Sequence, residues 1–180
     1  MKKLFVLLLV FFVFLKAVKS QFLKPNSLLK ANKITFKVDD LSSSKVASNS
    51  ISIYNKANTF AGKTPKVWLD ERLIVGKAAK GSVLAAFTQT FSDTRLKELI
   101  NEHGLNITLY LTPTGKVAEV IYQVQKNSTL TGVELESLEI ALKRNVTYNL
   151  DQNLTKNGDF FIANFRVVYN SILNRQIQDY

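Results

Sequence analysis

The sequence has no cysteine, and His103 is its only histidine. The missing cysteines exclude disulfides, thiol catalysis and thiolate metal sites, and a single histidine excludes a two-histidine metal site within the chain. Long apolar runs are also missing, because the longest one covers only residues 4–15. Such a run falls short of the roughly 20 residues that a membrane-spanning helix needs.

This apolar run has the setting of a secretory signal peptide. Lys2 and Lys3 precede it, and small residues follow before Gln21. A basic start, a short apolar centre and small residues at the exit are the features of a cleaved signal. We therefore expect cleavage between Ser20 and Gln21 and export to a periplasm or the cell exterior. An uncleaved membrane anchor is the competing interpretation.

Positive charge is concentrated in the first half of the chain. Without the four lysines of residues 1–20, the formal net charge falls from +10 to +6, and residues 21–91 hold eleven Lys or Arg against four Asp or Glu. A basic segment attracts anionic glycans, lipids or cell-wall polymers. Singly spaced lysines are also typical of a solubilising surface, and without dense clusters they give no reason to expect nucleic-acid binding.

The patterns directly after the signal are weak. Residues 21–32 are polar, so we expect a poorly ordered lead-in. Residues 33–38 alternate between apolar and polar side chains, as a half-buried strand does, and residues 51–54 can pair with them as a second strand. We treat residues 21–60 as a basic lead-in with strands and assign residues 61–180 to a single α+β domain.

Helix signals follow in the middle of the chain. Residues 67–75 suggest a tight hairpin, and residues 82–91 fit a helix that Ser82 could cap, with a strand as the alternative. Ser92 is typical of an N-cap for a further helix, and Gly104 suits the left-handed position after its end. The expected inward residues of that helix are Leu96, Leu99 and Ile100.

The last third carries the clearest alternation. Residues 106–111 and 118–124 flank a Pro-Thr-Gly turn, which predicts an antiparallel hairpin. Thr131 and Glu134 form a capping box that opens a helix to about Arg144. That helix is expected to bury Leu135, Leu138 and Leu142, with Glu136 and a Glu139–Lys143 pair on its surface.

Two further strands are expected after this helix. The first covers residues 146–150, and the closing strand covers residues 159–169 after a primed turn at Asn157-Gly158. The whole order predicts an α+β fold with an antiparallel sheet. Its strand-strand-helix-strand core would be covered by one or two helices, with an extra N-terminal strand or hairpin region.

Three segments together resemble the TonB C-terminal-like module of bacterial envelope proteins. They are residues 108–120, the helix with Leu135, Leu138 and Ala141, and residues 161–169. In that family a Gly-Lys-Val turn, Gly115 to Val117 here, joins two strands, a helix covers them and a last strand completes the sheet. The resemblance covers roughly residues 92–170 and implies partner recognition at a sheet edge.

Searches for catalytic patterns find no coherent set. His103 is typical of a surface residue at a helix end. Ser-x-x-Lys matches at Ser27 and Ser42 have no Lys-Thr-Gly partner, and residues 76–82 lack the lysine of a phosphate-binding loop. Adjacent acids on a strand point to opposite faces, which is unsuitable for a glycosidase. We expect a non-catalytic protein without a cofactor or metal.

Four Asn-x-Ser/Thr triplets are glycosylation acceptors in a host that modifies exported proteins. They begin at Asn106, Asn127, Asn145 and Asn153. Asn106 and Asn145 are expected on the polar faces of strands, where a glycan has room. The bacterial character of the resemblance favours unmodified asparagines.

Two functions fit these observations. The first is an interaction module that binds a protein or peptide along the closing strand, whose candidate edge residues are Asn164, Arg166 and Val168. That edge could instead be blunted by its polar residues or covered by residues 170–180. The second function is binding of an anionic glycan, lipid or cell-wall polymer through residues 21–91.

Overall fold

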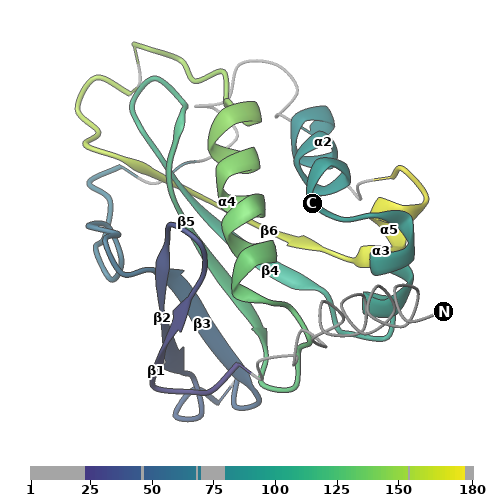
Figure 1. Cartoon of the computed structure of the whole chain (residues 1–180). Coiled ribbons are helices and arrows are strands. Elements are labelled where there is room, and N and C mark those ends of the chain that lie inside the picture. The colour runs from purple at the N-terminus through teal and green to yellow at the C-terminus, as the bar shows by residue number, and fades with distance from the viewer. Residues whose placement is uncertain (1–22, 46, 68, 70–79, 154, 177–180) are drawn as a thin grey trace, which may run out of the picture.

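The computed structural model describes residues 23–45, 47–67, 69, 80–153 and 155–176. These residues form a six-stranded sheet and four helices, which makes the fold α+β, as expected (Figure 1). The strand order is β1-β2-β3-β5-β4-β6, and every neighbouring pair is antiparallel. The strands are β1 (Ser27–Lys30), β2 (Thr35–Asp40), β3 (Ser50–Asn55), β4 (Leu105–Leu111), β5 (Val117–Gln125) and β6 (Phe161–Val167).

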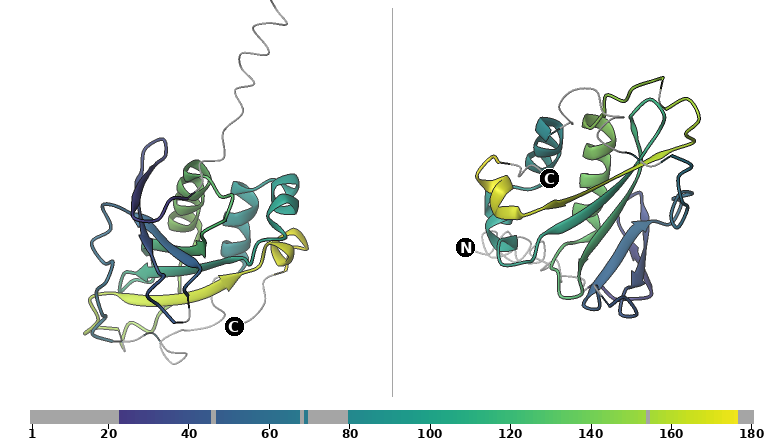
Figure 2. Two further views of the ribbon diagram at one scale, coloured as in Figure 1. Left: turned by 90° about the horizontal axis from the view of Figure 1, so that it is seen from below. Right: turned by 180° about the vertical axis from the view of Figure 1, so that it is seen from behind.

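Helices cover one face of this sheet. They are α2 (Lys80–Thr90), α3 (Asp93–Leu99), α4 (Gly132–Asn145) and the short α5 (Tyr169–Leu173). Figures 1 and 2 show α2 and α4 stacked over the strands, with α3 and α5 together near the end of β6. Alternate apolar residues of the strands point toward these helices and form one core with them. No described helix is long and apolar enough to cross a bilayer.

The lead-in that we expected to be poorly ordered contains strand β1. Leu29 of β1 pairs with Phe36 of β2 and is only 3% exposed. A Cβ atom added to Gly132 would lie 3.1 Å from the Leu29 Cγ atom, so Leu29 packs against the start of α4. The burial of Leu29 orders this segment despite its polar composition. Strands on both sides of residue 61 therefore share one sheet.

Several local expectations are confirmed. Strands β2 and β3 form at the expected places, and residues 82–91 lie mostly in a helix, not in a strand. Ser92 caps α3 by accepting a hydrogen bond from the Arg95 N–H. The capping box of Thr131 and Glu134 is present in full at the start of α4. The β4–β5 hairpin also forms, with a register shift between Tyr110 and Leu111.

The polar side of α4 was predicted wrongly. Glu136 is 3% exposed and Glu139 is 1% exposed, although both were expected on the helix surface. Glu139 does pair with Lys143 at 2.8 Å, but the pair is packed against the sheet. Helical periodicity alone could not reveal this, because the partners come from distant segments: the turn between β1 and β2 brings two main-chain N–H groups to Glu136, and β3 brings the Asn55 amide to Glu139.

The C-terminal third also differs from expectation. Residues 146–150 form no strand, although Thr147 makes an isolated antiparallel bridge with Lys116 and Leu150 also occupies a single bridge position. Neither Asn157 nor Gly158 has the positive φ that a primed turn requires, and β6 pairs with β4, which lies far from that turn in sequence.

Two further differences concern the ends of elements. Ile100 is exposed because α3 ends before it, and Gly104, with φ +86°, leads into β4 instead of following the helix directly. Val168 caps α5 and lies outside β6, and Tyr169 belongs to α5. The expected signal cleavage site and most of the hairpin at residues 67–75 lie outside the described residues, as does the Ser82 side chain.

Candidate functional site

Strand β6 forms one edge of the described sheet. It pairs with β4 on one side and stands last in the strand order. It has seven residues without proline, whereas β1 at the opposite edge has only four. Short strands are a common way to blunt an edge, so β6 is the better template for an added strand.

The geometry of Gly104 reveals which groups of β6 face outward. A Cβ atom built on Gly104 would lie 2.4 Å from the carbonyl oxygen of Val167, so this carbonyl points toward β4. Main-chain groups of successive residues point to alternate sides of a strand. The N–H and C=O groups of Ile162, Asn164 and Arg166 therefore point away from β4, toward the edge.

Two of the three expected edge residues are in place on this strand. Asn164 accepts a hydrogen bond of 2.7 Å from the Thr108 hydroxyl, and Arg166 donates one of 2.5 Å to the His103 carbonyl. Both side chains are exposed on the face of the sheet opposite to the helices. Val168, the third, lies outside β6 as the N-cap residue of α5 and is not part of the edge.

The described part of the C-terminal tail is held near α3. Helix α5 contacts α3, and Arg175 forms an ion pair of 2.9 Å with Asp93. Figure 1 shows α5 beside α3, beyond the end of β6. Residues 169–176 thus leave the middle of β6 without a pairing strand from the described chain.

A groove crosses β5, β4 and β6 on the same open face. It has a volume of about 390 Å³. Asn106 of β4 lies directly between Gln123 of β5 and Arg166 of β6, and Thr108 lies beside Asn164 in the next row. Its lining residues are Asn106, Ile107, Thr108, Gln123, Asn164, Phe165 and Arg166.

An aromatic cluster covers the open face next to this groove. Tyr110 of β4 stacks on Phe60 with ring centroids 5.7 Å apart, and Phe160 packs against both rings. Tyr110 is only 4% exposed although it points away from the helices. The segment after β3, which carries Phe60, therefore closes this part of the face.

A polar cluster occupies the face over β2 and β3. The Tyr54 hydroxyl donates to Asp39 at 2.6 Å, and the Lys37 ammonium donates to both groups. Burial and the bond to Asp39 raise the pKa of Tyr54, and bonding to Tyr54 and Asp39 raises that of Lys37. At Asp39, burial on its own would raise the pKa of the carboxyl, but hydrogen bonds from Tyr54 and Lys37 outweigh it and lower this pKa. These shifts keep Tyr54 neutral, Lys37 protonated and Asp39 ionised over a wider pH range. Groups that resist a change of protonation suit a structural role better than acid–base catalysis.

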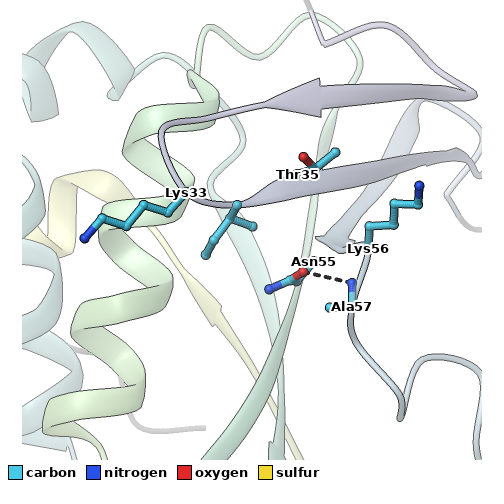
Figure 3. A pocket seen from close by; sticks show the side chains of 6 residues that line it. Lys33, Thr35, Asn55, Lys56 and Ala57 are labelled. Atoms are coloured by element: carbon cyan, nitrogen blue, oxygen red, sulfur yellow. Dashed lines mark hydrogen bonds between the residues drawn. The ribbon is translucent and has the colours of Figure 1, made fainter.

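The basic N-terminal segment forms one further pocket, of about 490 Å³. Lys33, Thr35, Asn55 and Lys56 are among its lining residues, near α4. Figure 3 shows the Lys33 and Lys56 side chains extending in different directions. Because the two ammonium groups do not point to a common place, they do not form a site at which both could bind one anion.

The expected modification sites are spread over the molecule. Asn106, Asn127 and Asn153 are exposed. Asn145 is the last residue of α4, not a strand residue, and its amide donates to Gln89 at 3.0 Å. His103 is exposed in the turn before β4, and no group of three or more potential metal ligands occurs in the described residues.

Comparisons with known proteins show the fold alone. No family model matches the chain, and no curated protein is significantly similar to it. The crystal structure of a DUF5043 family protein from Bacteroides uniformis ATCC 8492 is similar, with a TM-score of 0.66. The two chains are 16% identical over 82% of this chain and 87% of the other.

Proposed function

We propose that this protein is an exported, non-catalytic interaction module of a bacterial periplasm or cell exterior. In this proposal it resembles a TonB C-terminal-like domain and binds a segment of a protein partner as an added strand along β6. The observation that carries the proposal is the edge position of β6, with outward main-chain groups at Ile162, Asn164 and Arg166. Strand addition uses such groups for affinity.

The resemblance adds an argument from chain order. In support of the proposal, β4, β5, α4 and β6 come in the chain order that the resemblance implies, and Gly115 and Lys116 lie between β4 and β5, directly before Val117. Edge pairing is the recognition mode that this resemblance implies. The partner would continue the sheet beyond β6.

Two substitutions at Asn164 distinguish the contribution of its main-chain N–H to partner binding from that of its side chain. Asn164→Pro removes the outward N–H, and Asn164→Ala removes the side-chain amide but keeps the N–H. Proline is tolerated on sheet edges, so both variants should keep the fold by circular dichroism. In capture from envelope extracts, Asn164→Ala should retain the partner bound by the wild type, and Asn164→Pro should lose it.

Two results would contradict strand addition. One is equal capture by the wild type and both Asn164 variants, and the other is capture of no partner by the wild type. High salt provides a further control, because charge-driven binding weakens steeply with ionic strength and main-chain pairing does so much less.

Export is tested separately by the N-terminus of the mature protein. Protein collected outside the cytoplasm should begin at Gln21. Exported protein that still begins at Met1 would contradict cleavage and would favour the uncleaved anchor.

A further inference from the structure

The groove across β5, β4 and β6 carries two side-chain amides that have no hydrogen-bond partner among the described residues. Asn106 and Gln123 are direct cross-strand neighbours, and neither side chain makes a hydrogen bond with any described residue. Arg166 faces Asn106 from the other side. The three side chains form a row across three strands that lie about 4.8 Å apart.

The charge of this groove points to a carboxylate. Arg166 is the only charged residue among the seven that line it. One terminal nitrogen of Arg166 donates to the His103 carbonyl, which leaves other donors of the guanidinium for a ligand. A guanidinium beside two amides suits a carboxylate whose neighbouring groups both donate and accept hydrogen bonds.

The main chain beneath the groove excludes the usual mode of peptide binding. Strand β4 pairs with β5 on one side and with β6 on the other, so its main-chain groups are already used. A ligand lying on this face can be recognised only by side chains. The amides of Asn106 and Gln123 match the adjacent hydroxyls of a sugar, and a rigid ring loses little conformational freedom on binding.

We propose that this groove binds an acidic oligosaccharide. A uronic acid carboxylate pairs with Arg166, and hydroxyls of the same or the next ring bond to Asn106 and Gln123. This site uses side chains on the face of the sheet, whereas strand addition uses the outward main-chain groups of the β6 edge. It also differs from binding through the lysines of residues 21–91.

Calorimetric titration with trigalacturonic acid and with a hyaluronan tetrasaccharide tests the site. Arg166→Gln should weaken binding at least about tenfold, because it removes a charge-assisted hydrogen bond. Arg144→Gln is the matched control, since it removes the same charge from α4 on the helical side, and it should leave the affinity unchanged. Asn106→Ala and Gln123→Ala should each weaken binding about threefold or more, with unchanged melting temperatures.

Control ligands separate sugar recognition from charge. Maltotriose, which has no carboxylate, and triglutamate, which has no hydroxyls, should both bind more weakly than the acidic sugars. The proposal is overturned if neither acidic sugar binds at about 10 mM, if triglutamate binds as tightly, or if Arg166→Gln and Arg144→Gln lose affinity equally. Loss of protein capture in Ile162→Pro, which removes an outward N–H outside the groove, with sugar binding retained would show that the two sites are separate.

Discussion

The Glu136 carboxylate accepts hydrogen bonds of 2.9 and 3.2 Å from the N–H of Lys33, which lies 103 residues earlier in the chain. The same carboxylate accepts a bond of 2.6 Å from the Asn32 N–H. One buried side chain of α4 thus satisfies two main-chain donors in the turn between β1 and β2. This contact fastens the N-terminal hairpin to the helical layer.

Glu136→Ala should therefore lower the free energy of unfolding by about 1–3 kcal/mol, because it leaves the N–H groups of Asn32 and Lys33 without their acceptor. Ser137→Ala, at an exposed neighbouring position, should change it by less than about 0.5 kcal/mol. Urea unfolding of both variants measures the difference. Equal and small effects would show that water replaces the carboxylate at no cost.

The buried stripe of α4 gives a second prediction. Leu138 is fully buried, and Leu138→Ala should destabilise the protein by about 2–5 kcal/mol because it leaves a cavity over the sheet. Ile140 on the same helix is 48% exposed, and Ile140→Ala should cost less than about 1 kcal/mol. Similar shifts in thermal melting for the two variants would contradict the packing of this helix.

Glu139 should make stability depend on pH. Burial raises the pKa of its carboxyl against the opposing bond from Lys143, and its Oε2 atom has no hydrogen-bond partner in the described structure. A raised pKa means that the folded state keeps this proton to higher pH than the unfolded chain does. The stability contributed by the protonated form is complete below the unfolded pKa of about 4.3 and is lost as pH rises through the folded pKa.

A Gln substitution isolates this effect. The free energy of unfolding of the wild type, relative to Glu139→Gln, should decrease as pH rises from about 4 toward neutral pH. Denaturant titrations at several pH values supply the comparison. Parallel curves for the two proteins would mean that Glu139 titrates at its ordinary value.

Local sequence signals predicted the elements whose partners lie close in the chain. The capping box at Thr131, the N-cap at Ser92 and the β4–β5 hairpin depend on residues only a few positions apart. Strand β1 escaped prediction because its order comes from pairing with β2 and from the contact of Leu29 with Gly132, about a hundred residues away. The polar composition of residues 21–32 gave no indication of the pairing with β2 or of the contact with Gly132.

The candidate site was predictable only in part. Alternation in the closing strand placed Asn164 and Arg166 on its polar side, but chain order does not say that β6 lies at an edge. The row of Gln123, Asn106 and Arg166 depends on the register of three strands. A shift of one residue would move these side chains to the opposite face, so the row is visible only once pairing is known.

Gly115 and Gly62 provide a matched pair for the last prediction. Both have positive φ angles, +79° and +76°, that disfavour a side chain. A Cβ atom on Gly115 would also lie 1.8 Å from the carbonyl oxygen of Tyr148, whereas one on Gly62 would meet nothing within 4 Å. Gly62→Ala should cost about 1 kcal/mol from the backbone conformation alone, and Gly115→Ala at least about 3 kcal/mol. Urea unfolding measures both, and equal losses would show that residues 146–150 move away from the hairpin turn without cost.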